Sequence, residues 1–402
     1  MKPYRHFLVD DLVQGYGLDD KMSLMRYEPA SKEEMIVYHD SYYIDFISQP
    51  MENLKTEKAN VINEVYLDTD CPNFTGLFDY CQLIAGGSLA AARSLNNGLC
   101  DVAINWGGGL HHAKWNRAYG FCYVNDPVLA IVELLKHNGR VLYLDIDCHH
   151  GDGVEAAFYS TNRVMTLSFH LYEKNFFPGT GNMNDIGVGA GLHHSSNVPL
   201  KMGITDDDYE QIFKPIVSNV LQKYQPNVIV MQCGTDSLAG DRLGRLNLTL
   251  KGHSNCVKYV ISKNIPLILL GGGGYRPANA ARCWTLETAI ALEEELPISI
   301  PEIESYEYFA PEFRLEISPV SIENKNTSNY ISDILRKHCQ KCQNETKREP
   351  QPSQPTITHH QHTNNGTTTV NYRNPKLRYR STRFAQPMEK NILSPVDYWP
   401  ES

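Results

Sequence analysis

Residues 141–153 read VLYLDIDCHHGDG, a short apolar run followed directly by acidic and imidazole side chains. Side chains two positions apart on a strand project to the same face, so Asp145, Asp147 and His149 can converge on one point. Such a run is typical of a buried strand in an α/β sheet, which carries its chemistry at the carboxyl ends of its strands. Oxygen and nitrogen ligands without a thiolate suit a zinc or ferrous ion with an open coordination position. Taken alone, the stretch also fits a calcium-binding loop or solvated charges at a strand end.

Three more apolar runs end at turns that contain glycine and lead into polar side chains. They are residues 102–106 (VAINW) before His111 and His112, residues 227–232 (NVIVMQ) before Asp236, and residues 266–270 (PLILL) before Tyr275. Because parallel strands end at one edge of their sheet, we expect these side chains to share one site. The glycines at 271–274 lack the Gly-Lys-Ser/Thr and Gly-x-Gly-x-x-Gly patterns of nucleotide-binding loops. The combination favours a metalloenzyme.

Several motifs carry a resemblance to a known family. They are GGLHHAK (108–114), GFCYVND (120–126), DIDCHHGDG (145–153), FPGTG (177–181), QCGTDSL (232–238), GGGGY (271–275) and ARCW (281–284). In these motifs and their spacings, the chain resembles the class I zinc-dependent histone deacetylases from Met1 to about residue 343. The resemblance implies a single arginase-like α/β domain over residues 1–343, with a central, mostly parallel sheet and helices on both faces.

The resemblance also implies roles for the side chains at the strand ends. The zinc ligands would be Asp147, His149 and Asp236. The catalytic groups would be a tyrosine, two histidines and the carboxylate behind each histidine: Tyr275, His111, His112, Asp145 and Asp152.

Substrate and potassium sites follow from the same resemblance. A tunnel for the acyl-lysine side chain would be lined by Gly120, Phe121, Phe177 and Leu243, and Asp70 at its rim would hold the substrate backbone. A structural potassium ion would be bound at Asp145, Ser168 and Phe169.

The activity implied by the resemblance is hydrolysis of N6-acetyl-lysine on histone tails and other proteins, with release of acetate and repression of transcription. The cofactor would be Zn²⁺, with Fe²⁺ as the alternative, and the partners would include subunits of corepressor complexes in the nucleus and also in the cytoplasm. Two other functions stay open: an amidohydrolase of small molecules such as acetylpolyamines, and a catalytically weak corepressor scaffold. Asp70 favours a peptide substrate, because a carboxylate that accepts backbone N–H groups suits a peptide better than a polyamine.

Two features depart from the family pattern. Members normally have a strand before the Met-Lys-Pro element, whereas Met1–Pro3 opens this chain, which predicts an unpaired edge in the sheet. Lys2 and Arg242 match basic positions at which class I enzymes bind inositol phosphates, but a third such position is Ala278. Multiply charged phosphates need several converging cations, so weak inositol phosphate binding is expected.

Composition bears on the partners and on the end of the chain. The net charge of −9 argues against sequence-specific DNA binding by the domain. No apolar run approaches the roughly 20 residues of a membrane span, and ten scattered cysteines indicate a reducing compartment. Residues 344–402 are polar and lack apolar periodicity. This composition predicts a disordered tail that can be removed without loss of catalysis.

Overall fold

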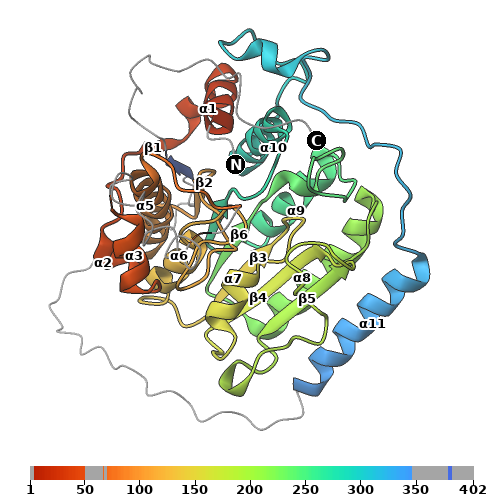
Figure 1. Cartoon of the computed structure of the whole chain (residues 1–402). Coiled ribbons are helices and arrows are strands. Elements are labelled where there is room, and N and C mark those ends of the chain that lie inside the picture. Colours follow the sequence, from red (N-terminus) through yellow and green to blue (C-terminus); the bar gives the residue numbers. More distant parts are fainter. Residues whose placement is uncertain (1–3, 50–66, 68–69, 346–378, 383–402) are drawn as a thin grey trace, which may run out of the picture.

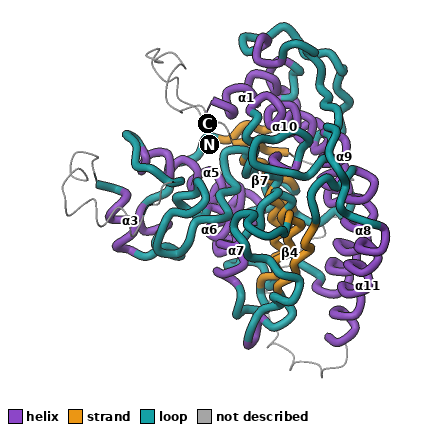
Figure 2. Tube along the Cα trace, turned by 45° about the vertical axis from the view of Figure 1, so that its right-hand side comes forward, coloured by secondary structure: helices purple, strands orange, loops and turns teal. Residues whose placement is uncertain are grey.

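The computed structural model describes residues 4–49, 67, 70–345 and 379–382. Lys2 lies outside these residues, as does most of the expected tail, 344–402. The described chain forms an α/β domain with helices on both faces of a parallel sheet (Figures 1 and 2). The predicted fold class is therefore confirmed.

Six parallel strands form the main sheet, and two short strands extend it beyond β2. The sheet order is β1-β8-β2-β7-β6-β3-β4-β5, and each of these pairings is parallel. The strand bounds are β1 (Ser23–Met25), β2 (Val102–Asn105), β3 (Val141–Asp145), β4 (Val164–Leu171), β5 (Ser195–Leu200), β6 (Val228–Gln232), β7 (Leu267–Leu270) and β8 (Tyr379–Thr382). The four strands predicted from apolar runs, β2, β7, β6 and β3, are consecutive in this order, so their carboxyl ends lie side by side.

Helices cover the sheet on both faces. The helix bounds are α1 (Tyr4–Gly15), α2 (Lys32–Met35), α3 (Ser41–Ile47), α5 (Leu77–Asn96), α6 (Asp126–Leu134), α7 (Asp152–Phe158), α8 (Asp206–Tyr224), α9 (Leu250–Ile261), α10 (Pro277–Ala291) and α11 (Ser328–Glu345). In β3, Leu142 and Leu144 pack into the core under α1, α8, α9 and α10, whereas Val141 and Tyr143 pack with α5, α6 and α7. This alternation follows from the two-residue period of a strand. Figure 2 shows the strands between the two helix layers.

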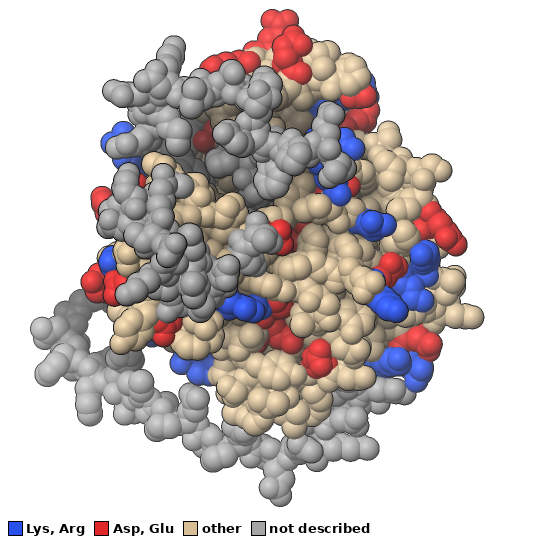
Figure 3. All heavy atoms as spheres, in the orientation of Figure 1, with Lys and Arg blue, Asp and Glu red and all other residues tan. Residues whose placement is uncertain are grey.

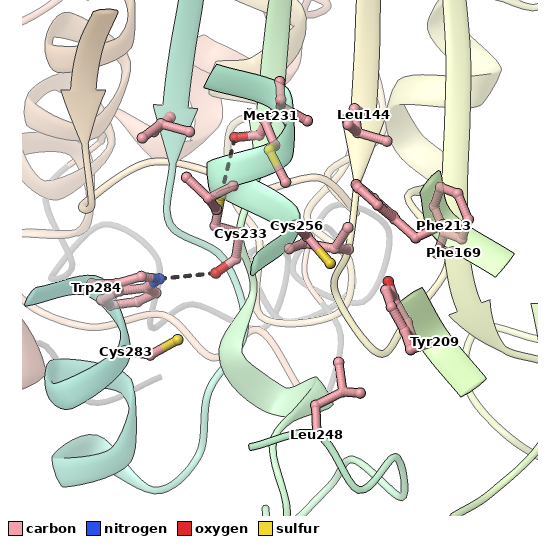
Figure 4. Packing of buried hydrophobic residues seen from close by; sticks show 14 of the residues in the cluster. Leu144, Phe169, Tyr209, Phe213, Met231, Cys233, Leu248, Cys256, Cys283 and Trp284 are labelled. Atoms are coloured by element: carbon pink, nitrogen blue, oxygen red, sulfur yellow. Dashed lines mark hydrogen bonds between the residues drawn. The ribbon is translucent and has the colours of Figure 1, made fainter. Parts of the chain in front are cut away.

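The larger core anchors the loop that follows β6. Figure 4 shows Trp284 of α10, whose Nε1 donates to the backbone oxygen of Cys233 at 2.9 Å. In the same core, the ring of Phe169 lies 5.0 Å from that of Phe213 and 5.9 Å from that of Tyr209. The segment that carries Asp236 is thus tied to a buried helix.

The starts of two helices follow ordinary capping chemistry. At α6, the side chain of Asn125 accepts a hydrogen bond from Val128 N, with a proline in the first turn. At α11, which begins at Ser328, Thr327 Oγ1 accepts a hydrogen bond from Tyr330 N at 3.3 Å.

On the face drawn in Figure 3, acidic and basic side chains are mixed over much of the surface, and acidic side chains gather at its top. Among the described helices, none combines the length and the apolar character needed to cross a membrane.

Candidate active site

The ends of β3 and β6 bring the three expected metal ligands together. Asp147 and His149 follow β3, and Asp236 lies in the 3-10 helix Thr235–Ser237 after β6. Their ligand atoms all lie within 4.8 Å of one another, and the three side chains are buried. His149 Nδ1 is 2.9 Å from Asp236 Oδ2 and 3.2 Å from Asp147 Oδ1. Two carboxylates and one imidazole are a common set of three protein ligands at a catalytic metal.

The backbone around these ligands leaves no room for larger residues. A Cβ at Gly234 would lie 1.9 Å from Asp147 Oδ2, and a Cβ at Gly273 would lie 2.1 Å from Asp236 Oδ2. Asp147 Oδ2 accepts hydrogen bonds from Gly273 N and Gln232 Nε2, both at 2.9 Å. Oriented donors of this kind fix a ligating carboxylate. The donor set, its burial and this close backbone fit a divalent cation.

The charges of the three side chains also fit a cation. Burial raises the pKa of Asp236, and the neighbouring Asp147 carboxylate raises it further, to about 7. Burial lowers the pKa of His149, but Asp236 and Asp147 outweigh burial and raise it to about 10. Two buried carboxylates this close repel each other, and a divalent cation between them would remove that repulsion.

Two histidines lie beside the ligand cluster, each with its own carboxylate. His111 Nδ1 is 2.7 Å from Asp145 Oδ2, and His112 Nδ1 is 2.7 Å from Asp152 Oδ1. Asp152 Oδ2 also contacts Lys114 Nζ. The centroids of the two imidazole rings are 4.0 Å apart. With each Nδ1 held by a carboxylate, each Nε2 is left to act on a substrate.

The two histidines nevertheless differ in charge. Burial lowers the pKa of His111, but Asp145 and Asp147 outweigh burial and raise it to about 9. Burial and the charge on His111 lower the pKa of His112 to about 3, although Asp152 opposes this. His112 is therefore a neutral imidazole at pH 7, which leaves a ring nitrogen available as a proton acceptor.

Aromatic side chains surround the approach to His112. The ring of Phe177 lies 4.9 Å from that of His112 and 5.0 Å from that of Tyr119. The ring of Phe121 lies 5.8 Å from that of Tyr275. Gly120 has a φ of 54°, and a Cβ there would lie 2.7 Å from Phe177 Cζ and 2.8 Å from His112 Cδ2. Of the four residues expected to line the tunnel, Gly120 and Phe177 thus lie beside His112, and Phe121 lies beside Tyr275.

The expected rim residue and the fourth expected tunnel residue are both on the surface. Asp70 of the rim is exposed, and Leu243 of the tunnel lining is 42% exposed. Leu243 is joined to the site through Asp241, whose Oδ1 accepts from Leu243 N at 2.9 Å and whose Oδ2 accepts from Tyr275 N at 2.8 Å. Asp241 was not among the predicted site residues, although it lies three positions after QCGTDSL.

The residues expected at a potassium site are close together. Asp145 and Ser168 are register partners on β3 and β4, and Phe169 follows Ser168. Asp145 Oδ2 accepts from Tyr143 OH at 2.6 Å as well as pairing with His111. Asp145 therefore serves the histidine pair whether or not an ion lies behind it.

A buried pair that the sequence did not predict holds the loop after β6. His253 of α9 has Nδ1 2.6 Å from Glu287 Oε1 of α10 and Nε2 2.9 Å from the backbone oxygen of Gly234. Both partners are acceptors, so the ring must donate from both nitrogens. Burial lowers the pKa of His253, but Glu287 outweighs burial and raises it. Although Cys283 lies nearby, both imidazole nitrogens are already hydrogen-bonded, so the cluster supports the Asp236 loop rather than binding a second metal.

We expect His253→Ala to weaken metal binding through this loop. It leaves Glu287 buried without its partner and should lower the free energy of unfolding by about 3–5 kcal/mol. Zinc affinity should fall by roughly tenfold or more, as for other residues that orient metal ligands. The matched control is Thr288→Val on α10, the helix that carries Glu287; it removes the acceptor of Trp106 Nε1 (3.0 Å). It should cost about 1–3 kcal/mol and leave zinc affinity unchanged. Equal zinc affinities in the two variants, measured by competition with a chelator, would contradict this role.

Comparison with known proteins agrees with this geometry. A family model described as histone deacetylase domain matches residues 1–291. Human histone deacetylase 1 is 52% identical over 337 residues, which cover 84% of this chain and 70% of the human protein. Histone deacetylase 9 of Arabidopsis thaliana is 53% identical over 334 residues, which cover 83% of this chain and 78% of the plant protein. Because the family model covers most of the chain, and about half of the aligned positions are identical in relatives that cover 83–84% of it, this chain belongs to the histone deacetylase family.

Proposed function

We propose that this protein hydrolyses N6-acetyl-lysine side chains of histone tails and other proteins, and thereby represses transcription. The observation that carries the proposal is a buried Asp147–His149–Asp236 cluster beside a neutral His112. The reaction breaks the C–N bond of the side-chain amide and yields acetate and the free amine of lysine. It needs a base to activate water, an acid for the leaving amine and a donor for the oxyanion.

His112 is suited to move the proton. Its Nδ1 is bound to Asp152, which fixes the tautomer with a free Nε2. The neutral ring takes a proton from water at Nε2 and then delivers it to the departing amine. Protonated His111 beside it contributes positive charge near the developing oxyanion and keeps the pKa of His112 low.

Tyr275 is suited to stabilise the oxyanion. Burial and the nearby Asp236 and Asp147 carboxylates raise the pKa of its hydroxyl well above the usual value, so that it stays protonated. A protonated hydroxyl donates a hydrogen bond to the oxygen that becomes negative during amide hydrolysis.

The three ligands would hold Zn²⁺, with Fe²⁺ as the alternative. When bound, zinc supplies a Lewis acid for the amide carbonyl and for water. Asp145, Ser168 and Phe169 would hold a structural K⁺.

Metal binding should become weaker as the pH falls. Zinc requires a neutral His149 and an ionised Asp236, whose pKa values are raised to about 10 and about 7. Above pH 7, zinc binding therefore releases at least the proton of His149. Below pH 7, Asp236 is also protonated in the metal-free protein, so zinc binding releases a second proton. The zinc Kd should therefore rise about tenfold for each unit by which the pH falls towards 7, and more steeply as the pH falls below 7. Calorimetry in buffers of different ionisation enthalpy measures the released protons. A Kd independent of pH between 6 and 8 would contradict this charge assignment.

The substrate is proposed to be a peptide rather than a small amide. Asp70 is exposed, and it matches the position at which the family holds the substrate backbone. A carboxylate there can accept hydrogen bonds from two backbone N–H groups. Nuclear corepressor subunits are the expected partners, with inositol phosphate binding that is weaker than in other class I enzymes. Arg242 is exposed, but Ala278 offers no charge at the third basic position.

Side-by-side assays distinguish the peptide substrate from the alternatives. The zinc-loaded full chain is given an acetyl-lysine peptide and an N-acetylated polyamine, and Asp70→Ala is assayed on both. We expect the unmodified protein to have a higher kcat/KM for the peptide than for the polyamine. In Asp70→Ala, kcat/KM for the peptide should fall roughly 10- to 100-fold, whereas kcat/KM for the polyamine should stay unchanged. A preference for the polyamine would favour the small-molecule enzyme, and turnover of neither substrate would favour a scaffold.

A further inference from the structure

A strand from the far end of the chain lies inside the sheet. β8 runs parallel between β1 and β2, where the dark blue arrow appears in Figure 1. On one side the register partners are Val102 with Tyr379, Ala103 with Arg380 and Ile104 with Ser381. On the other side they are Ser23 with Arg380, Leu24 with Ser381 and Met25 with Thr382. Three residues are thus paired on each edge of a four-residue strand.

The position of β8 is one that a strand must fill. All four residues of β2, Val102–Asn105, are at most 3% exposed, and one edge of β2 pairs with β7. Without a strand on the other edge, the N–H and C=O groups of β2 on that side would lose their main-chain partners. β1 cannot supply them where it stands, because it lies two strand spacings away, on the order of 10 Å.

We propose that residues 379–382 are a structural strand that completes the sheet next to β2. Tyrosine and threonine at the two ends of the segment favour a strand, and pairing through the main chain places no demand on hydropathy. Residues 346–378, which separate it from α11, would span roughly 100 Å if extended, so the connection does not limit the position of β8. α5 packs across both β2 and β8. This proposal reverses the prediction that the tail is dispensable.

The strand would act on the active site through β2. Asn105, at the end of β2, donates from Nδ2 to Ser88 Oγ at 2.9 Å, and Ser88 Oγ donates to Asp126 Oδ2 at 2.6 Å. Asp126 in turn accepts from Gly109 N and Leu110 N, both at 2.9 Å, directly before His111. Loss of the β8 ladder would therefore loosen the turn that carries the histidine pair.

Hydrogen exchange on the unmodified, zinc-loaded full chain tests the proposal without any substitution. The amides of residues 379–382 should exchange at least roughly 100-fold more slowly than those of a free peptide of residues 374–386, and the amides of Val102–Asn105 should also be protected. Exchange of the 379–382 amides at the rate of the free peptide would overturn the proposal.

A substitution within the full chain gives a second test. Ser381→Pro removes a ladder donor from a strand that is paired on both edges, so thermal unfolding should occur roughly 3–6 °C lower. Exchange at Val102–Asn105 should also become faster. Thr368→Pro, in the same tail but outside β8, is the matched control and should change neither quantity. Equal behaviour of the two proline variants would overturn the proposal.

Discussion

Asp236→Asn is expected to abolish zinc binding and turnover together. It removes one of three protein ligands, so we expect zinc affinity to fall by roughly 100-fold or more. Turnover of an acetyl-lysine peptide should fall by about 10³-fold or more, because the reaction loses its Lewis acid. Elemental analysis and steady-state kinetics on the same preparation measure both quantities.

The metal-free form of this variant provides the control for folding. Asp236 has a raised pKa, so above about pH 7 its buried charge costs the folded state stability. Removing that charge should therefore leave metal-free Asp236→Asn at least as stable at pH 8 as the metal-free unmodified protein. A variant that keeps stoichiometric zinc and full rate would contradict the assignment of Asp236, and a variant that unfolds at a lower temperature would contradict the charge argument.

Tyr275→Phe is expected to separate chemistry from metal binding. It removes one hydroxyl and no metal ligand, so zinc should stay bound while kcat falls by about 10²–10³-fold. Tyr119→Phe is the matched control, because Tyr119 contacts Phe177 (5.0 Å) as Tyr275 contacts Phe121 (5.8 Å), but Tyr119 is not assigned to the oxyanion. We expect its kcat to change by no more than about fivefold. If both variants lose activity equally, the hydroxyl of Tyr275 has no special role.

Much of the sheet could be predicted because four of its strands have simple sequence patterns. β2, β3, β6 and β7 are short apolar runs that are buried throughout and are followed by polar residues or by glycine. β5 reads SSNVPL, and its Ser195, Ser196 and Asn197 are buried, so hydropathy carries no strand signal there. β8 lies in a polar tail and pairs through its main chain, which composition does not report.

The site was predictable where the ligands lie close together in sequence after a strand. Asp147 and His149 lie in the turn directly after β3, so the end of this strand carries both to one cluster with Asp236. His253 and Glu287 are 34 positions apart on two helices, and no local pattern joins them. The adjacent His111 and His112 also look equivalent in the sequence. Their opposite pKa shifts arise from the carboxylates that surround His111 and from the charge that His111 then imposes on His112.

The most direct test of the central claim is acetate release from an acetylated histone-tail peptide, measured with zinc-loaded full chain and with His112→Ala. We predict that the unmodified protein produces acetate and deacetylated peptide in equal amounts. We predict that His112→Ala keeps its zinc but loses about 10²–10⁴-fold in kcat, because its proton acceptor is gone. A zinc-stoichiometric unmodified protein that releases no acetate, or a His112→Ala variant with an unchanged rate, would contradict the account.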